Sequence, residues 1–342
     1  MNLVRLPLVC WWRALTSTRF ERLGVKTLHL KAAPANALHP SPAFSIALLL
    51  FATAAPAQPA GDYLEQHDTI YNSLTVEKRG SIVELRARSR RGEYLESAVD
   101  LRDPLKLVVP YTRTLYAALF LQPAPRRALM IGLGGAGFHR LFAAAYPAAE
   151  LRTVELDPKV FELCQTRLGF NPTDRTPVTI MDGRLFVKRD QSRWDWIILD
   201  AFRGGYVPPH LKTLEFYREC AARLSEHGVF VANLHSGTQL HFSDLRTISE
   251  VFPQVVIFRT AIAGNVIACA VNYKVPDITD PAAWPPAEDL ARPEFAGRLD
   301  LAAIRGERAD PPRAQMREAR VLTDDFAPVE FLDVIKANNT TE

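Results

Sequence analysis

Residues 132–137 of this 342-residue chain read Gly-Leu-Gly-Gly-Ala-Gly, directly after an apolar run that ends at Ile131. Glycine lets the backbone turn sharply and approach a ligand, because no Cβ atom stands in the way. The free N–H groups at the start of a following helix favour an anionic or strongly polar ligand. The strand–turn–helix context therefore predicts a turn that binds a nucleoside or dinucleotide. Its glycines are Gly132, Gly134, Gly135 and Gly137.

Three acidic side chains follow this turn, each where a predicted strand ends. Glu155 can accept hydrogen bonds from two ribose hydroxyls, a device that NAD enzymes and S-adenosyl enzymes share. Asp182, followed by Gly183, stands where an acid typically accepts a bond from an adenine amino group. Asp200 ends the fourth strand, at the edge where ligands bind in open α/β sheets. Capping of a helix N-terminus is the structural alternative for each acid, but the set predicts a nucleoside pocket.

NAD is the main competing ligand for such a pocket. Residues 182–200 lack a second nucleotide-binding half with its own glycine turn, and the acid after the third strand also favours an S-adenosyl nucleoside. The four cysteines lie far apart, and no spacing typical of metal ligands occurs. The sequence therefore predicts S-adenosylmethionine or its decarboxylated form as the bound co-substrate, and no metal.

The elements that must position these residues begin at residue 127, where apolar runs start to alternate with stretches of helical periodicity. This alternation predicts a Rossmann-like, doubly wound parallel sheet. The last two strands have no helix between them, so one of them should run antiparallel, as in the seven-stranded sheet of class I S-adenosylmethionine methyltransferases. The predicted strands are 128–131, 151–156, 178–181, 196–199, 229–233, 255–259 and 266–271. The predicted helices lie near 138–146, 158–168, 183–189, 213–225 and 240–250.

The flanking segments differ in character. Residues 61–110 carry short β-prone runs and predict a small antiparallel sheet of hairpins, whereas residues 111–122 show helical spacing. Residues 275–320 are Pro-rich and charged, and they are expected to form coil with a short helix before a closing segment at 321–330. The predicted division is a leader (1–57), a small β-domain (58–110), a Rossmann-like catalytic domain (111–274) and a C-terminal segment (275–342).

The leader contains an apolar run, residues 44–55, that is too short to span a bilayer as a helix. It suits the core of a signal peptide, and Ala55-Pro56-Ala57 is a small-residue cleavage site. The alternative is a disordered tail with an accidental apolar patch. A signal peptide predicts a periplasmic or membrane-associated protein, and its absence a cytoplasmic one. No transmembrane segment is expected beyond the leader.

The net charge of +3 is unevenly distributed. Residues 1–57 hold six of the 41 basic side chains and one of the 38 acidic ones, which leaves 35 basic and 37 acidic side chains in the rest. A slightly acidic body gives no general electrostatic reason to bind nucleic acid. The expected partners are small molecules.

From residue 127 to residue 233 the chain resembles the spermidine synthase (polyamine aminopropyltransferase) family. It resembles more closely the divergent bacterial branch called spermidine synthase-like. The family resemblance rests on Gly132–Gly137, Val154–Pro158, Met181–Arg184, Ile197–Asp200 and Thr213–Tyr217. The resemblance to the branch rests on Pro208–Thr213 and on Leu322-Thr323-Asp324-Asp325.

The resemblance implies that Glu155 holds the ribose, that Asp182 holds the adenine, and that a substrate amine lies near Asp200. A neutral amine must attack the carbon next to a sulfonium, so a carboxylate should orient the amine and accept its proton. The implied activity is aminopropyl transfer to a polyamine or another acceptor. Methyl transfer and a catalytically degenerate, ligand-binding member of the family are the alternatives, and a homodimer stays open.

Three places depart from the family pattern. Gly135 stands where the glycine turn usually carries an acid. Arg203 stands where the family has an acid thought to deprotonate the amine, and Tyr111-Thr112-Arg113 replaces Tyr-His-Glu. Arg113 and Arg203 would repel a polyamine, which favours an anionic or neutral acceptor.

The remaining candidates lie around the expected acceptor site. We expect Asp200, Arg203 and His210 to act in catalysis, with His210 as the best candidate base. We expect Tyr111, Tyr206 and Asp324 to line the acceptor site. An N-cap or a salt bridge to Arg320 is the alternative for Asp324.

Overall fold

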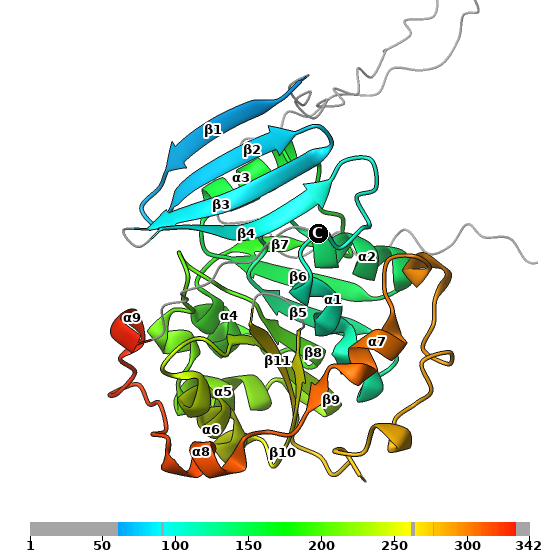
Figure 1. Ribbon diagram of the computed structural model, residues 1–342, viewed down its shortest axis with the longest axis vertical. Helices are drawn as coiled ribbons and strands as arrows, with labels where there is room; N and C mark the ends of the chain where they lie inside the picture. Colours follow the sequence, from blue (N-terminus) through cyan, green and yellow to red (C-terminus); the bar gives the residue numbers. More distant parts are fainter. Residues whose placement is uncertain (1–60, 90–91, 261–263, 276, 333–342) are drawn as a thin grey trace, which may run out of the picture. The chain divides into compact units, whose positions relative to one another are not determined.

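The computed structural model describes residues 61–332, apart from residues 90–91, 261–263 and 276. The predicted leader, residues 1–57, lies outside the described residues. The described chain forms a four-stranded sheet and then an eight-stranded sheet with helices on both faces (Figure 1). Among the helices of this described part, none is both long and apolar enough to cross a membrane.

The first sheet is antiparallel, with its strands in sequence order. Its strands are β1 (Tyr63–Asp68), β2 (Ser73–Arg79), β3 (Ile82–Ser89) and β4 (Gly92–Asp100). Alternate residues such as Leu74 and Leu85 are buried, because successive side chains of a strand point to opposite faces. They pack against Val160 and Leu163 of α3 (Pro158–Thr166). The small antiparallel sheet predicted from the sequence is confirmed.

The second sheet has the strand order β12-β10-β11-β9-β8-β5-β6-β7. Strands β5 to β9 are parallel, and β11 runs antiparallel to both β9 and β10. The predicted Rossmann-like, class I methyltransferase-type sheet is therefore confirmed. The strands are β5 (Arg127–Ile131), β6 (Glu150–Glu155), β7 (Val178–Ile180), β8 (Trp194–Leu199), β9 (Leu224–His235), β10 (Gln254–Arg259), β11 (Asn265–Val271) and β12 (Arg308–Ala309).

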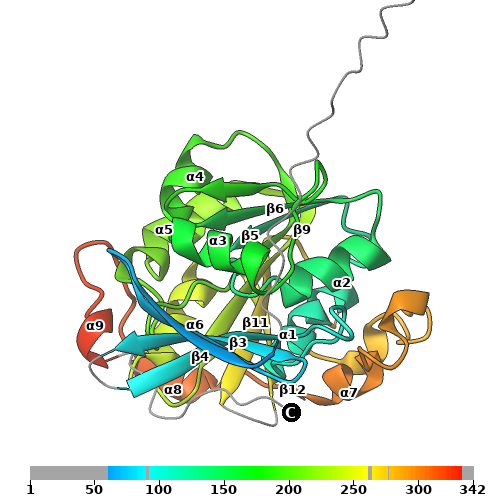
Figure 2. The same ribbon diagram turned by 90° about the horizontal axis from the view of Figure 1, so that it is seen from above.

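Alternate side chains of the central strands supply two separate cores. Met130 and Trp196 face the first core, and Leu129 and Ile197 face the second core. A separate set of helices covers each core. The first set is α1 (Tyr111–Thr114), η1 (Leu115–Phe120), α2 (Gly137–Ala145) and α7 (Leu301–Gly306). The second set is α4 (Gly183–Arg189), α5 (Leu214–Ala221), α6 (His241–Val251) and α8 (Arg313–Glu318). Figure 2 shows the two sets on opposite sides of the sheet. A buried Leu, Ile or Phe contributes about 1.5–3 kcal/mol, so this alternation fixes which face each strand presents.

Three segments differ from the sequence-based expectation. Residues 111–122, predicted as one helix, form a single α-helical turn followed by the 3₁₀ helix η1. Every residue of η1 is buried, so packing on all sides replaces the one-sided periodicity of a surface helix. The helix predicted over 213–225 is shorter, because α5 ends at Ala221. The strand predicted over 229–233 is longer, because β9 begins at Leu224, which pairs with Trp194. The segment 275–320 contributes β12 as an eighth strand, antiparallel to β10.

Candidate functional site

One pocket lies where the parallel strands β5, β6 and β8 end, and the first sheet closes one side of it. It brings together most of the residues that the sequence pointed to. Those lining it are Gly132, Gly134, Gly137, Glu155, Asp182, Gly183, Asp200, Tyr111, Arg203 and His210. Gly135, Tyr206 and Asp324 do not line it. Glu96, which the sequence did not single out, does.

The glycine turn is shaped by close contacts with its neighbours. Gly132 has φ +103°, and a Cβ atom on it would lie 2.0 Å from the carbonyl oxygen of Asp200. Only glycine fits such a position, because an L side chain would be strained there and would also collide with backbone. A Cβ atom on Gly135 would lie 2.6 Å from the Ser97 hydroxyl and 2.7 Å from Leu168. Gly135 therefore serves the close packing of the glycine turn on Ser97 of β4 and on Leu168 rather than the pocket wall.

Glu155 is held rigidly at the end of β6. Its Oε2 accepts the backbone N–H of Leu133 at 3.0 Å, and its Oε1 accepts that of Asp157 at 2.8 Å. The carboxylate thus ties the glycine turn to the residues after β6. Burial raises the pKa of Glu155 to about 7, although both backbone bonds favour the charged form.

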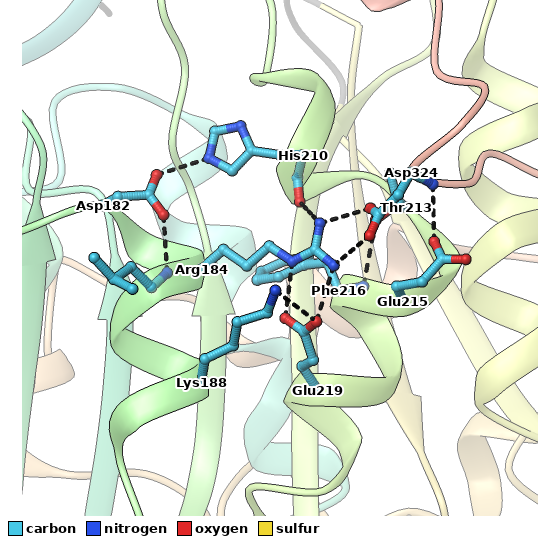
Figure 3. Close-up of polar contacts among 10 residues, drawn as sticks. Asp182, Arg184, Lys188, His210, Thr213, Glu215, Phe216, Glu219 and Asp324 are labelled. Carbon is cyan, nitrogen blue, oxygen red and sulfur yellow. Dashed lines mark hydrogen bonds and ion pairs between the residues drawn. The ribbon is translucent and has the colours of Figure 1, made fainter.

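Asp182 has two local partners. Its Oδ1 caps α4 by accepting the backbone N–H of Leu185 at 2.8 Å. Asp182 therefore has the helix-capping role that was the structural alternative for each acid. Its Oδ2 lies 2.7 Å from Nε2 of His210 (Figure 3). The hydrogen bond to His210 lowers the pKa of Asp182. The ring of His210, the residue expected as the best candidate base, lies against Asp182.

Asp200 lies at the end of a chain of buried side-chain bonds. The Tyr111 hydroxyl donates to its Oδ2 at 3.0 Å, and the Asn233 amide donates to its Oδ1 at 2.9 Å. Asn265 donates in turn to the Asn233 side-chain oxygen at 2.9 Å. Burial raises the pKa of Asp200, while the bonds from Asn233 and Tyr111 oppose that shift. Sequence reasoning missed Asn233 and Asn265, whose only signal is an amide near the end of a predicted strand.

Neither arginine that suggested an anionic acceptor extends freely into the pocket. Arg203 lines its edge, but the side chain is exposed and its Nε donates to the Tyr71 carbonyl at 2.8 Å. Arg113 does not line the pocket and donates to the Leu107 carbonyl. Tyr206 packs with Leu240 and Leu322 in a separate cluster. Arg113 therefore gives no reason to expect an anionic or neutral acceptor, and Arg203 gives a weaker reason than its residue type suggested.

Asp324 belongs to an ion-pair network beside the pocket (Figure 3). Arg184 contacts both oxygens of Asp324, at 2.6 and 2.7 Å, and both oxygens of Glu219, each at 2.9 Å. The Thr213 hydroxyl donates to Asp324 at 2.7 Å. Asp324 thus anchors the closing segment to α4 and α5. The salt bridge of Asp324 is made by Arg184 and not by Arg320. The Arg320 guanidinium instead stacks on the Phe326 ring, 3.5 Å from its centre.

The ionisable side chains that line the pocket are predominantly acidic. Four carboxylates line it, those of Glu96, Glu155, Asp182 and Asp200. Among the described lining residues, Arg203 is the one Lys or Arg. Of the two histidines, His139 is buried, and burial lowers its pKa to about 3, so it is neutral. The described residues contain no group of three or more His, Cys, Asp or Glu that could hold a metal ion.

Comparisons with known proteins agree with this architecture. Residues 110–266 match the family model of the spermine/spermidine synthase domain. The polyamine aminopropyltransferase of Vibrio vulnificus is 31% identical over 278 residues, which cover 79% of this chain and 91% of that protein. A probable spermidine synthase from Corynebacterium glutamicum has the same fold, with a TM-score of 0.60 at 22% identity over 80% of this chain and 99% of that one. A spermidine synthase in complex with the transition-state analogue AdoDATO superposes with a TM-score of 0.57 at 20% identity, over 74% of this chain and 88% of that one. This chain therefore belongs to the spermine/spermidine synthase (polyamine aminopropyltransferase) family.

Proposed function

We propose that the chain binds decarboxylated S-adenosylmethionine in this pocket and transfers its aminopropyl group to an amine. The acidic lining of the pocket is the observation that carries the proposal, since four carboxyl groups and one exposed guanidinium line it. Decarboxylated S-adenosylmethionine carries a sulfonium and an ammonium, whereas S-adenosylmethionine carries a carboxylate as well. In a buried, acidic pocket that extra negative charge is unfavourable. The balance favours aminopropyl transfer over methyl transfer.

The nucleoside would be held by groups that are already in place. Glu155 would accept bonds from the ribose hydroxyls, and Asp182 would accept one from the adenine amino group. The backbone of Gly132–Gly137 would approach the nucleoside without intervening side chains. The relative that binds AdoDATO, a transition-state analogue, supports a nucleoside-like ligand here.

The reacting end would lie at Asp200. The acceptor amine attacks the methylene carbon next to the sulfonium, an N–C bond forms, and the C–S electron pair leaves with sulfur as a neutral thioether. Asp200 would orient the attacking nitrogen through a hydrogen bond, because Tyr111 and Asn233 fix both of its oxygens. A positioned carboxylate therefore meets the nitrogen where positive charge develops.

A thermal-shift titration of the full chain tests the choice of ligand. We expect decarboxylated S-adenosylmethionine and methylthioadenosine to raise the melting temperature at concentrations where S-adenosylmethionine raises it less, since ligands that bind only the folded state stabilise it by mass action. A larger shift with S-adenosylmethionine would support methyl transfer instead. No shift with any of the three would support the degenerate, non-enzymatic alternative.

Nucleoside affinity should depend on pH through Glu155. Its pKa in the free protein is raised to about 7, so at pH 6 the carboxyl is mainly protonated and at pH 8 mainly charged. The charged form is the better acceptor for ribose hydroxyls, so methylthioadenosine should bind more tightly at pH 8, by up to about tenfold. Calorimetric titration across this range should show proton release on binding.

The Glu155→Gln variant should bind the nucleoside weakly at every pH and lose this slope. Glu162→Gln is the matched control, because Glu162 is half-exposed on α3 and outside the pocket. A wild-type affinity that is flat between pH 6 and pH 8 would contradict the role of Glu155.

A further inference from the structure

Glu96 is the unpaired residue of a β-bulge in the first sheet. In the pairing of β3 with β4, Leu85 lies opposite Ser97 and Arg86 lies opposite Leu95, so Glu96 has no partner. A bulge breaks the regular alternation of a strand and re-aims a side chain. This one lies against the glycine turn, because a Cβ atom on Gly134 would lie 3.8 Å from the Glu96 carbonyl oxygen. The bulge thus brings a carboxylate from the first sheet into the pocket.

The Glu96 carboxylate is incompletely satisfied. A backbone N–H of Gly204 bonds it, and Gly204 directly follows Arg203 in the loop after β8. Its Oε1 is buried and has no hydrogen-bond partner among the described residues. Leaving a buried acceptor unpaired costs about 1–3 kcal/mol, so a ligand donor that reaches Oε1 would recover that cost.

The surroundings of Glu96 favour a cationic donor. Burial, together with the nearby charges of Asp200 and Glu155, raises the pKa of Glu96 to about 8. Tyr111 also faces it as a neutral phenol, since burial raises the pKa of Tyr111 well above its usual range. Arg203, the cation at the pocket edge, is bonded to the Tyr71 carbonyl. Two neighbouring carboxylates in a site that excludes water are relieved when one of them takes a proton or when a cation lies between them.

We propose that Glu96 is the second acceptor carboxylate of the site: with Asp200 it binds an aliphatic amine, and it takes that amine's proton. The assignment rests on the proposed function. It returns to the site a carboxylate like the one that Arg203 replaces, from a different element of the fold. It also assigns the acceptor to the class of cationic aliphatic amines, in place of the anionic or neutral acceptor that Arg113 and Arg203 suggested.

The proton balance is complete within the pocket. When Glu96 is ionised, the acceptor enters as an ammonium and passes one proton to it, which leaves a neutral amine and a neutral carboxylic acid. The amine then attacks, the N–C bond forms, the C–S bond breaks, and the product leaves as a secondary ammonium with a neutral thioether. Glu96 returns its proton to solvent, so the net reaction releases one proton.

Calorimetric binding of 1,4-diaminobutane to the full chain saturated with methylthioadenosine tests the assignment without turnover. We expect the wild type to bind the diamine and Glu96→Gln to bind it at least tenfold more weakly, with methylthioadenosine binding unchanged in both. Glu93→Gln is the matched control, since Glu93 is exposed on the same strand and does not line the pocket. Its diamine affinity should equal that of the wild type.

Turnover with decarboxylated S-adenosylmethionine gives the second readout. Glu96→Gln should lower kcat by about 10²–10⁴-fold, as expected for loss of a general base, and should abolish the pH dependence that its ionisation imposes. Glu96→Asp should restore part of both.

The outcomes separate this assignment from the proposed function. Equal diamine binding by wild type and Glu96→Gln, or no diamine binding by the wild type, would overturn the role of Glu96. Glu96-dependent diamine binding without aminopropyl transfer would instead support Glu96 as an amine ligand and contradict the proposed function.

Discussion

Replacing Asp200 with Asn should lower the rate of aminopropyl transfer by about 10²–10⁴-fold while leaving methylthioadenosine affinity within about threefold of the wild type. The carboxylate sits where the attacking nitrogen becomes positive, and an amide offers no charge there. The fold should survive, because the amides of Asn233 and Asn265 can turn to meet the new side chain and the Asn265 side-chain oxygen is unpaired among the described residues. Steady-state kinetics and calorimetry on the same preparation measure the two effects.

The matched control for this change is Asp195→Asn. Asp195 lies on the same strand, β8, and accepts backbone N–H groups of Arg126 and Arg127 at the end away from the pocket. It should keep wild-type kcat even if its melting temperature falls. An Asp200→Asn variant that transfers the aminopropyl group within threefold of the wild-type rate would remove Asp200 from the mechanism.

The second large effect concerns stability. Replacing Arg184 with Met should lower the free energy of unfolding by about 3 kcal/mol, which corresponds to a fall of roughly 6–12 °C in Tm. Arg184 is buried to 9% side-chain exposure and pairs with Glu219 and Asp324 at once. Without the guanidinium these two carboxylates keep their charges and lose their partner. Asp324 is 44% exposed, so water compensates part of the loss, and the expected loss of stability lies at the lower end of the range for buried pairs.

The closing segment should loosen in the same variant, because Asp324 is its attachment to α4. Limited proteolysis should therefore cut after residue 320 sooner than in the wild type. Arg189→Met, an exposed change on the same helix, should alter neither Tm nor the cleavage pattern. Wild-type stability in Arg184→Met would show that the network contributes little.

The large sheet was predictable because its signals are local. Apolar runs separated by helical stretches specify parallel strands, and parallel strands bring their carboxyl ends to one edge. Glu155, Asp182 and Asp200 each follow such a run, so their convergence follows from topology without any knowledge of side-chain contacts. The antiparallel β11 was predictable for the same reason, since no helix separates it from β10.

The acceptor side was not predictable in the same way. Glu96 reaches the pocket through a bulge and through the packing of one sheet on another, and neither leaves a motif in the sequence. Arg203 shows the same limit, because its residue type gives the charge of the side chain but not its hydrogen bond to the Tyr71 carbonyl. Asp324 was expected to line the acceptor site, but it lies outside the pocket and pairs with Arg184, which is 140 residues away. Such pairings depend on tertiary structure.

Identification of the products formed by the full chain tests aminopropyl transfer directly. The protein would be incubated with decarboxylated S-adenosylmethionine and 1,4-diaminobutane, and in parallel with S-adenosylmethionine and the same diamine. Separation by liquid chromatography and mass spectrometry should show methylthioadenosine and N-aminopropyl diamine in equal amounts in the first incubation, and no S-adenosylhomocysteine in the second. S-adenosylhomocysteine in the second incubation, or unchanged substrates in both, would contradict aminopropyl transfer by this chain.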